Sequence, residues 1–504
     1  MTDLQRFEPN TKTLGEIAAF LGADVKDVFE DVEIAGICSN SQTIQEGELF
    51  LALPGAKTHG GAFLPSAVER GARAVLTDIA GSELSSVRDS AIPVLVVPNP
   101  RSQSGYLADW FNESPSQNMY LAGITGTNGK TTTTYLLNQI WSEAGFESGL
   151  MGTIGISVGK DSFPASHTTP EADVVHAVLS VMNERHVRVA AMEVSSHAIA
   201  QHRIDGVRFS AAGFTNLSQD HLDFHGTMEN YYQAKRALFE ANIAERGFIN
   251  IDNEFGVRLT KEISIPVATL SLSNKKATWY FESITQRKRG WEVSIRGEGG
   301  VLIEGQFNLP GEHNLENLLL AVAIATDSGI DPLVIGNSMA KLKGAPGRLE
   351  SIERGQKFTA LVDYAHTPDA VERVLQSLKQ HDSADSSRII GVVGCGGNRD
   401  VAKRPLMGKA LRNGSDIAIF TSDNPRDEEP DQILANMTEG MSLDDSAMVI
   451  VDRREAIATA IATANEGDIV IVLGKGHETG QEIKGVKVPF DDREELARAI
   501  EALT

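Results

Sequence analysis

The chain reads, from residue 119, Met119-Tyr120-Leu121-Ala122-Gly123-Ile124-Thr125-Gly126-Thr127-Asn128-Gly129-Lys130-Thr131-Thr132. An apolar strand, a glycine-rich turn, Lys-Thr and then an apolar-spaced helix (residues 133–140) are typical of loops that hold nucleotide phosphates. The glycines let backbone N–H groups face the anion, and the helix N-terminus adds a partial positive charge. We therefore expect Lys130 to reach the β- and γ-phosphates and the Thr131 hydroxyl to bind Mg²⁺.

The spacing of this loop differs from the usual phosphate-binding pattern, which places a Gly six residues before the Lys. Here Ile124 stands at that position, and the glycines fall at 123, 126 and 129. An incidental glycine-rich turn is the alternative, but the strand and the helix on either side are the context that the pattern requires. The sequence therefore predicts a variant phosphate-binding loop.

The composition is that of an acidic globular protein. Its 504 residues predict two to four domains. Hydrophobic residues make up 41% and charged residues 23%, which is ordinary for a globular chain. The formal net charge of −22 argues against a general binder of nucleic acid or anionic membranes.

The cysteines and the N-terminal residues indicate the cellular compartment in which we expect the protein. Cys38 and Cys395 lie far apart without metal-ligand spacing, so we expect no disulfide and a reducing compartment. The first ten residues lack the basic and apolar regions of a signal peptide. No run of 18 apolar residues occurs, so we expect no membrane span and a cytoplasmic location.

The string TGTNGKTT (residues 125–132) resembles the ATP loop of the Mur ligases and of the related folylpolyglutamate synthetases. Those enzymes use ATP to activate a carboxylate and then join it to an amine. The resemblance continues in order along nearly the whole chain and implies ATP and Mg²⁺ as cofactors. It implies an α/β protein of three domains, namely an N-terminal α/β uridine-nucleotide domain (1–98), a central P-loop ATPase-type parallel sheet (99–347) and a C-terminal Rossmann-like α/β domain (348–504).

Two further strings are expected to complete the ATP site. GEHNLEN (311–317) begins an apolar helix; helix capping by Asn314 is the plain interpretation, whereas the resemblance implies that Asn314 and Asn317 face the adenine. Arg348, in the expected hinge 344–350, is placed to neutralise transferring phosphate charge. The resemblance assigns ATP binding to Gly126, Thr127, Asn128, Gly129, Lys130, Thr131, Thr132, Asn314, Asn317 and Asp363.

Glu193 is the first candidate metal ligand besides Thr131. It follows a buried strand in VRVAAMEVSSH (187–197), at the end of the strand where ligand sites of open α/β sheets lie, so we expect it to hold Mg²⁺ near the γ-phosphate. A solvated strand-end Glu is the alternative. By resemblance, His221 in DHLDFHG (220–226) ligates a second Mg²⁺.

Lys235, in the helical string YYQAKRALF (231–239), has two interpretations. The helical pattern alone would let its amine extend to solvent. The resemblance implies that CO₂ carbamylates it, which turns a cation into an anion that binds Mg²⁺. The residues that we expect to carry the chemistry are Lys130, Glu193, His221, Lys235 and Arg348.

The N-terminal residues 1–98 read as a small α/β module. Residues 39–42 and 47–61 resemble the uridine-nucleotide domain of Mur ligases, which usually have Asp-Ser-Arg in place of Asn40-Ser41-Gln42 and Asp in place of His59. HTTPEA (167–172) is a helix start as a plain pattern. The resemblance assigns UDP-muramoyl-peptide binding to Ser39, Ser41, Ala56, Lys57, Thr58, His167, Thr168, Thr169, Ser195, Gln201 and Arg203.

The C-terminal region alternates strands and helices, which predicts an open, largely parallel sheet. We expect strands at 359–363, 388–394, 416–421, 447–451 and 468–473, and a more β-rich stretch earlier, at 250–305. Polar turns follow four of these strands and should converge on one crevice.

In DNPR (423–426), the guanidinium of Arg426 offers a fork that grips a carboxylate, although an exposed Arg after a turn is the alternative. In the family, DNPR marks addition of meso-diaminopimelate, and its pocket corresponds to Arg399, Asp423, Asn424, Pro425, Arg426, Gly474 and Glu478.

The resemblance therefore implies an ATP-dependent ligase of cytoplasmic peptidoglycan synthesis. It would add meso-2,6-diaminopimelate to the D-glutamate side-chain carboxylate of UDP-N-acetylmuramoyl-L-alanyl-D-glutamate through an acyl phosphate. We expect these small molecules as partners, no nucleic acid, and a monomer. Three alternatives stay open. A lysine-adding ligase is opposed by Arg426, a folylpolyglutamate synthetase-like ligase by the uridine-type domain, and a non-catalytic nucleotide-binding protein by the intact Lys130, Glu193 and Lys235.

Overall fold

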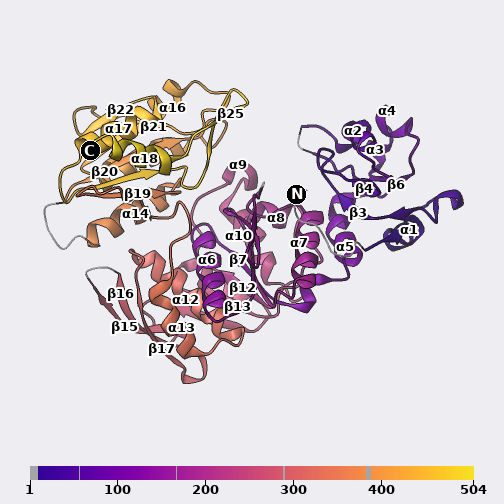
Figure 1. The fold of residues 1–504 in the computed structure, drawn as a ribbon, viewed down its shortest axis with the longest axis horizontal. Coiled ribbons are helices and arrows are strands. Elements are labelled where there is room, and N and C mark those ends of the chain that lie inside the picture. Colours follow the sequence, from indigo (N-terminus) through magenta and orange to yellow (C-terminus); the bar gives the residue numbers. More distant parts are fainter. Residues whose placement is uncertain (1–9, 56, 166, 288–289, 382–386, 504) are drawn as a thin grey trace.

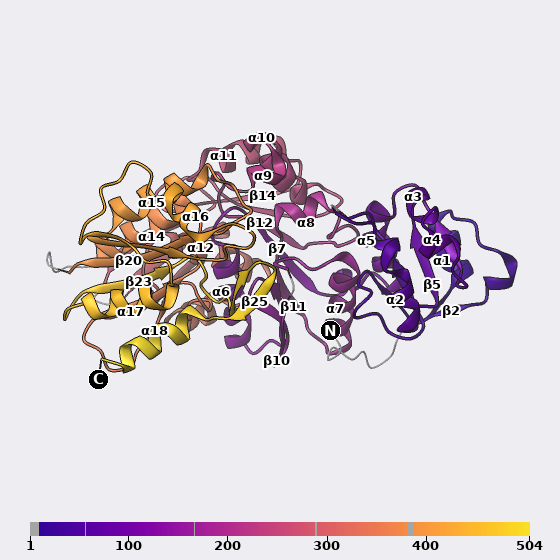
Figure 2. The same cartoon turned by 90° about the horizontal axis from the view of Figure 1, so that it is seen from above.

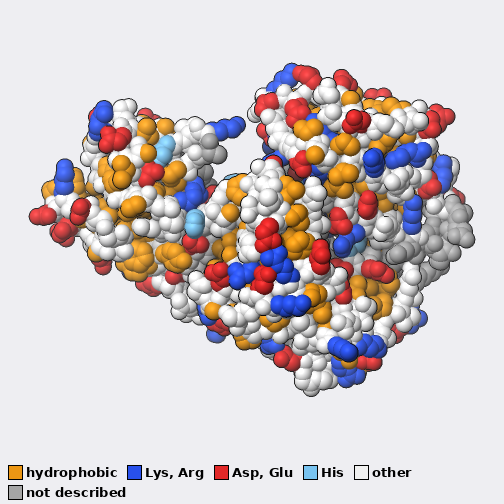
Figure 3. Space-filling view, turned by 180° about the vertical axis from the view of Figure 1, so that it is seen from behind, with side chains coloured by type: hydrophobic (Ala, Val, Ile, Leu, Met, Phe, Trp, Pro, Cys, Tyr) orange, Lys and Arg blue, Asp and Glu red, His pale blue; other side chains and the backbone are white. Residues whose placement is uncertain are grey.

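The computed structural model describes residues 10–55, 57–165, 167–287, 290–381 and 387–503. They form three α/β domains in a row, with the N-terminal domain at one end, the C-terminal domain at the other and the central sheet between them (Figures 1 and 2). A space-filling view shows a notch between the two outer domains, with acidic and basic side chains interspersed over the face on view (Figure 3). No helix in the described part of the chain is long and apolar enough to cross a bilayer.

The N-terminal domain is built on four parallel strands. They are β3 (Gly36–Cys38), β4 (Glu48–Leu51), β5 (Ala74–Thr77) and β6 (Val94–Val96). Helix α1 (Leu14–Leu21) begins after Thr13, whose hydroxyl and backbone exchange hydrogen bonds with Glu16 in a capping box. The short helices are α2 (Leu64–Glu69), α3 (Ile79–Ser82) and α4 (Ser85–Arg88). Helix α5 (Pro100–Phe111), capped by Asn99, leads into the central domain.

The central domain has an eleven-stranded sheet in the order β10-β9-β8-β11-β7-β12-β13-β14-β15-β16-β17. The pairs from β8 to β15 are parallel, and the hairpins at both ends are antiparallel. The strands are β7 (Tyr120–Thr125), β8 (Ser148–Gly152), β9 (Gly155–Val158), β10 (Asp161–Phe163), β11 (Val189–Glu193), β12 (Ala211–Phe214), β13 (Gly247–Asn250), β14 (Val267–Ser271), β15 (Trp279–Gln286), β16 (Trp291–Arg296) and β17 (Leu302–Phe307).

Successive residues of the central strands face opposite layers of the core. In β7, Ala122 and Ile124 pack with α6 (Lys130–Glu143) and α12 (Glu312–Asp327), whereas Leu121 packs with α7 (Ala172–Glu184). This alternation is the period of two that a doubly covered strand requires. The remaining helices are α8 (Ser196–Ala200), α9 (Leu222–His225), α10 (Met228–Arg236), α11 (Glu254–Glu262) and α13 (Pro332–Ser338).

The C-terminal domain confirms the predicted open parallel sheet, with the order β18-β19-β23-β20-β21-β22 and only β18 antiparallel. The strands are β18 (Glu350–Ser351), β19 (Thr359–Asp363), β20 (Ile389–Cys395), β21 (Ile417–Ser422), β22 (Ala447–Val449) and β23 (Ile469–Leu473). Its helices are α14 (Pro368–His381), α15 (Lys403–Gly414), α16 (Pro430–Met437), α17 (Arg453–Thr463) and α18 (Asp492–Glu501). A hairpin of β24 (Gly480–Ile483) and β25 (Val486–Pro489), which the sequence did not predict, follows β23.

Candidate active site

The glycine-rich loop joins β7 to α6 in the central domain, as predicted. Gly126 has φ 145° and Gly129 has φ 90°, values that favour glycine. A Cβ on Gly126 would lie 1.9 Å from Thr215 Oγ1, so a side chain has no room there. Asn216 holds the loop, because its carbonyl accepts from Thr127 N (2.9 Å) and its Oδ1 accepts from Asn128 N (3.0 Å). The loop is therefore fixed before α6 begins.

Lys130 is the first residue of α6, directly after this loop. Its Nζ donates to the carbonyl oxygens of Gly126 (2.9 Å) and Thr127 (2.9 Å). Burial lowers the pKa of Lys130, and the nearby Glu193 carboxylate opposes that shift. The amine is thus held by loop carbonyls at the N-terminus of α6, where an anion is favoured.

Glu193 ends β11, which pairs with β7, and its carboxylate lies beside the loop. It accepts hydrogen bonds from Thr131 Oγ1 (2.8 Å), Thr153 N (2.8 Å) and Thr153 Oγ1 (3.1 Å). Arg348 Nη2 donates to Thr131 Oγ1 (3.3 Å) from across the hinge. A hydroxyl and a carboxylate oxygen in contact are hard donors that fit Mg²⁺.

The other two predicted metal ligands lie elsewhere around the loop. Lys235 is 1% exposed, and its Nζ donates to Gly126 O (2.7 Å) while lying 4.7 Å from the Tyr231 ring centroid. Solvent exposure, the plain expectation for this Lys, is therefore wrong, because α10 packs its inner face on the loop. His221 packs edge-on to His197, and its Nε2 lies 3.4 Å from Asp220 Oδ2.

These contacts divide the four predicted metal-binding residues into separate groups. Thr131 contacts Glu193, whereas Lys235 contacts the loop carbonyl and His221 contacts Asp220. Among the described residues, no three His, Cys, Asp or Glu side chains form a metal-binding cluster. The Thr131–Glu193 pair is thus the part of the predicted set whose geometry fits a magnesium ion.

The predicted adenine-side residues are buried and bonded. Asn317 Oδ1 accepts from Thr133 Oγ1 (3.3 Å), which ties α12 to α6. Asn314 lies inside α12, whose N-cap is Gly311, so the capping interpretation of Asn314 is wrong. Asp363 ends β19, and its carboxylate accepts from Leu349 N and Ala365 N (both 2.7 Å).

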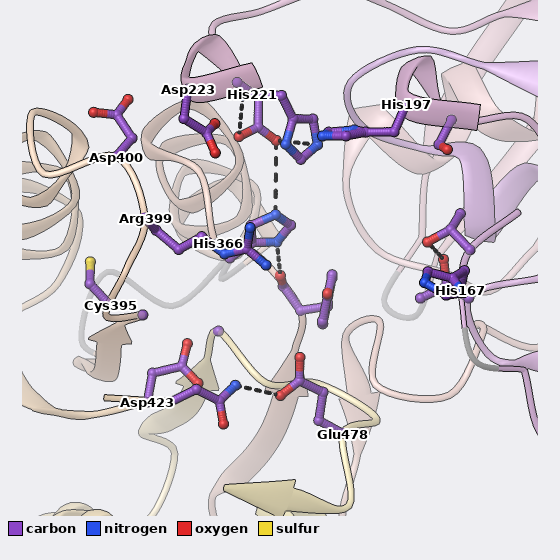
Figure 4. A pocket seen from close by; sticks show the side chains of 18 of the residues that line it. His167, His197, His221, Asp223, His366, Cys395, Arg399, Asp400, Asp423 and Glu478 are labelled. Carbon is purple, nitrogen blue, oxygen red and sulfur yellow. Dashed lines mark hydrogen bonds and ion pairs between the residues drawn. The ribbon is translucent and has the colours of Figure 1, made fainter. Parts of the chain in front are cut away.

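A cavity of about 600 Å³ lies between the central and C-terminal domains, and Figure 4 shows part of its wall. The predicted residues that line it from the central domain are His167, Thr168, Thr169, Ser195, Gln201, Arg203 and His221. Those from the C-terminal domain are Arg399, Asp423, Asn424, Arg426, Gly474 and Glu478. Pro425 belongs to the same turn but does not line the cavity. The strand-end turns thus converge as the topology predicted.

The DNPR turn is held in an unusual conformation. Arg426 has φ 51°, a strained value for a non-glycine residue. Its backbone N donates to Glu482 O (3.0 Å), its Nη1 donates to Gly397 O (2.8 Å), and its Nε lies 3.2 Å from Glu482 Oε2. The guanidinium is therefore fixed at the cavity wall rather than left exposed after a turn.

A second cavity of about 400 Å³ lies where the N-terminal domain meets α7. Ser39, Ser41 and Thr58 line it, whereas Lys57 is exposed outside it and Ala56 lies outside the described residues. Asp173 of α7 accepts from Ser39 N (2.8 Å) and from Ser39 Oγ (3.0 and 3.1 Å to its two oxygens). The Ser39 hydroxyl therefore anchors the cavity loop to the central domain, an arrangement that the sequence did not indicate.

The two departures from the family pattern have different surroundings. Gln42 lines the second cavity, and its backbone N donates to Asn40 Oδ1 (2.9 Å). His59 caps the turn before α2, because its Nδ1 accepts from Gly61 N (3.0 Å) while its Nε2 lies 3.0 Å from Asp78 Oδ1. An Asp at this position would satisfy the same backbone N–H.

Family models match most of the chain. The model described as Mur ligase family, catalytic domain, matches residues 33–101, the Mur ligase middle domain matches 124–325, and the Mur ligase glutamate ligase domain matches 347–476.

The chain belongs to the Mur ligase family. Mur ligases are ATP-dependent ligases, so the chain is an enzyme of this class. The chain is 42% identical to UDP-N-acetylmuramoyl-L-alanyl-D-glutamate--2,6-diaminopimelate ligase of Streptomyces coelicolor, over 97% of this chain and 96% of that protein. It is 42% identical to the protein of the same name from Aquifex aeolicus, over 94% and 95%.

Solved Mur ligase structures share the three-domain α/β fold. A solved UDP-N-acetylmuramoyl-L-alanyl-D-glutamate--2,6-diaminopimelate ligase superposes with a TM-score of 0.66 at 33% identity, covering 98% of this chain and 99% of that one. MurF from Thermotoga maritima in complex with ADP gives a TM-score of 0.64 at 17% identity, which shows the fold alone, over 93% of this chain and 97% of that one. The predicted fold class and family are therefore confirmed.

The sequence-based prediction missed several ionisable residues that line the cavity between the central and C-terminal domains, here called the main cavity. They are His197, Asp220, Asp223, His366, Asp400, Lys403 and His477. Asp220 joins the two domains, since Lys403 Nζ lies 3.7 Å and His366 Nε2 3.9 Å from its oxygens. Burial alone would raise the pKa of Asp220, but the charge of Lys403, together with His366 and His221, lowers it below its usual value. His366 and Asp400 lie in two of the predicted polar turns, which was the available signal, whereas Lys403 is the first residue of α15.

Proposed function

We propose that this Mur ligase joins meso-2,6-diaminopimelate to the D-glutamate side-chain carboxylate of UDP-N-acetylmuramoyl-L-alanyl-D-glutamate, in the cytoplasmic synthesis of peptidoglycan. The names of the relatives that match nearly the full chain support this substrate set. The observation that carries the proposal is the fixed Arg426 guanidinium, which lines the same cavity as the carboxylate of Glu478. A guanidinium and a carboxylate on one wall suit the carboxylate and the ammonium at the distal end of diaminopimelate.

The reaction has two stages. The γ-phosphoryl group of ATP passes to a carboxylate oxygen, which gives an acyl phosphate and ADP. The diaminopimelate amine then attacks the acyl carbon and loses a proton as the amide forms and phosphate leaves. Lys130 and Arg348 neutralise charge on the transferring group, and the loop N–H groups orient it. Mg²⁺, when bound by Thr131 and Glu193, supplies further neutralisation at the phosphates.

The remaining site assignments belong to the same proposal. We assign ATP to the loop 126–132 with Asn314, Asn317 and Asp363, the uridine end of the other nucleotide to the second cavity, and a carbamate to Lys235 with His221 as a further metal ligand. The divisions at residues 98/99 and 347/348 are supported by the starts of α5 at Pro100 and β18 at Glu350. Both cysteines are buried and free, which supports a reducing compartment. A monomer is part of the same proposal.

Product analysis tests the proposal. The chain is incubated with ATP, Mg²⁺, the UDP-muramoyl-dipeptide and meso-diaminopimelate, and the nucleotide product is identified by mass spectrometry. We expect a product heavier by one diaminopimelyl residue, together with one ADP for each amide formed, and no ADP without the amino acid. No ADP formation with any amino acid would contradict the proposal. ADP formation with L-lysine but not diaminopimelate would indicate the lysine-adding alternative.

A further inference from the structure

Lys475 is a fully buried cation between two turns of the main cavity. It lies in the turn after β23, between Gly474 and Glu478, and is 0% exposed. Its Nζ donates to Glu478 Oε2 (2.9 Å) and Asn424 Oδ1 (3.1 Å) and lies 3.5 Å from Asp423 Oδ1. An ammonium group has three donors. Lys475 therefore directs all three of them at the DNPR turn and at Glu478.

Burial of a charge in this way is costly unless every partner is in place. Folding alone does not require a lysine here, because apolar residues of similar volume often replace buried ion pairs without loss of stability. The partners of Lys475 are instead three residues of the cavity wall or its turns, namely Asp423, Asn424 and Glu478. Because all three partners line the main cavity, Lys475 is linked to the proposed amino-acid site.

Lys475 fixes the orientation of the Asn424 amide. The amide oxygen accepts from Lys475 Nζ and from Glu482 N (3.0 Å). Because Lys475 Nζ and Glu482 N are both donors, only the amide oxygen of Asn424 can face them. The amide nitrogen must therefore point the other way. There Asn424 Nδ2 donates to Glu478 Oε2 (2.9 Å). Without the ammonium, the main constraint against rotation of this amide would be a single backbone N–H.

The same contacts divide the two oxygens of Glu478. Oε2 accepts from both Lys475 and Asn424. Oε1 has no hydrogen-bond donor among the residues that the structure describes, and Figure 4 shows the Glu478 side chain at the cavity. Burial raises the pKa of Glu478, but the Lys475 charge and the Asn424 hydrogen bond outweigh burial and bring the pKa below its usual value. The carboxylate thus stays ionised with one oxygen free.

We propose that Lys475 is a positioning residue for the amino-acid substrate, which holds Asn424 and Glu478 so that Glu478 Oε1 receives the distal ammonium of diaminopimelate. This inference rests on the proposed function, because it assigns that ammonium to Glu478. Lys475 itself does not contact the substrate. Its effect passes through Glu478 and Asn424, so its removal should weaken binding of the amino acid rather than binding of either nucleotide.

The test compares Lys475→Met with Lys357→Met, which removes a lysine that is 76% exposed and paired with Glu466 in the same domain. We expect Lys475→Met to raise the KM for diaminopimelate about tenfold or more, with the KM values for ATP and the UDP-muramoyl-dipeptide within about twofold of wild type. Lys357→Met should match wild type in all three. A retained rise in melting temperature with ADP shows that the variant folds.

A double-mutant cycle separates positioning from a general effect. Glu478→Gln alone should raise the KM for diaminopimelate, and adding Lys475→Met to it should raise that KM by less than about threefold. Full multiplication of the two effects would overturn the inference, and so would an unchanged KM for diaminopimelate in folded Lys475→Met.

Should Lys475→Met not fold, Lys475→Gln is the second variant. Lys475→Gln keeps a hydrogen-bond donor but not the charge, so we expect a smaller rise in the KM for diaminopimelate. An unchanged KM for diaminopimelate again overturns the inference. If the wild type does not use diaminopimelate at all, the proposed function fails before any variant is measured. Normal wild-type turnover with unchanged KM in the variants rejects the role of Lys475 alone.

Discussion

The side-chain amines of Lys130 and Lys235 donate to the same acceptor, the carbonyl oxygen of Gly126, at 2.9 and 2.7 Å. One amine comes from the first residue of α6 and the other from α10, so two buried amines meet at the turn of the phosphate-binding loop. Burial lowers the pKa of Lys235 well below its usual value, and the charge of Lys130 lowers it further. The structure therefore provides a buried amine with a raised neutral fraction beside the loop.

The first prediction concerns carbamylation of Lys235. A neutral amine is the form that attacks CO₂, and the resulting anion would replace repulsion of Lys130 by attraction. We expect a carbamate signal by NMR when the wild type is equilibrated with isotopically labelled bicarbonate. The signal should be absent in Lys235→Ala, whose kcat should fall on the order of 100-fold or more. A labelled signal in both proteins, or in neither, would contradict this assignment.

The second prediction concerns the anchor between Ser39 and Asp173. Asp173→Asn replaces one accepting oxygen with a donor that faces the Ser39 N–H or hydroxyl. Loss of hydrogen bonds to a buried charged group costs on the order of 1.5–3 kcal/mol. We expect the KM for the UDP-muramoyl-dipeptide to rise about tenfold, with the KM for diaminopimelate unchanged.

The control for this anchor is Asp161→Asn, whose carboxylate is 62% exposed and paired with Arg185. It should have wild-type kinetics. An equal rise of all three KM values in Asp173→Asn would indicate general damage to the fold, and no rise at all would show that the anchor does not shape the cavity loop.

The third prediction concerns pH and His176. This residue is fully buried in α7, and burial lowers its pKa to about 4, although Asp205 O lies 3.0 Å from Nε2 and opposes the shift. The unfolded chain binds a proton near pH 6.5, so between these values the unfolded state carries more protons than the folded state. The contribution of His176 to stability is therefore complete above pH 6.5 and is lost as the pH falls towards 4.

The measurement is the melting temperature of wild type and His176→Gln between pH 7 and pH 4.5. A shift of this size corresponds to at most on the order of 3 kcal/mol. We expect the wild type to lose more stability on acidification than the variant. Parallel curves would contradict the assignment of the buried neutral state to His176.

Local sequence patterns were enough to predict the main strands of the protein and the ends of those strands. The strand predicted at 359–363 is β19, residue for residue, because an apolar run bounded by turn residues defines a buried parallel strand. The strand-end position of Glu193 followed from the same logic. The stretch 250–305 is β-rich as predicted, since it contains β14, β15, β16 and most of β17. The prediction missed α11 at its start, although Asn253 is a residue that commonly caps a helix.

Contacts between distant residues could not be predicted in the same way. Ser39 and Asp173 are 134 residues apart, and only the packing of the N-terminal domain on α7 makes them partners. Lys475 stood between two predicted site residues, yet its burial depends on the DNPR turn, about 50 residues earlier in the chain. Lys235 appeared to border an exposed face because the helix pattern carries no information about the loop that covers it.

The most direct test of the central claim measures amino-acid-dependent ADP formation with meso-diaminopimelate and with L-lysine, for wild type, Arg426→Ala and the control Arg354→Ala, whose guanidinium is 47% exposed. We predict that wild type and control strongly prefer diaminopimelate. The preference should collapse in Arg426→Ala, at a cost on the order of 2–5 kcal/mol in kcat/KM for diaminopimelate. Preference of the wild type for lysine, or an unchanged preference in Arg426→Ala, would contradict the account.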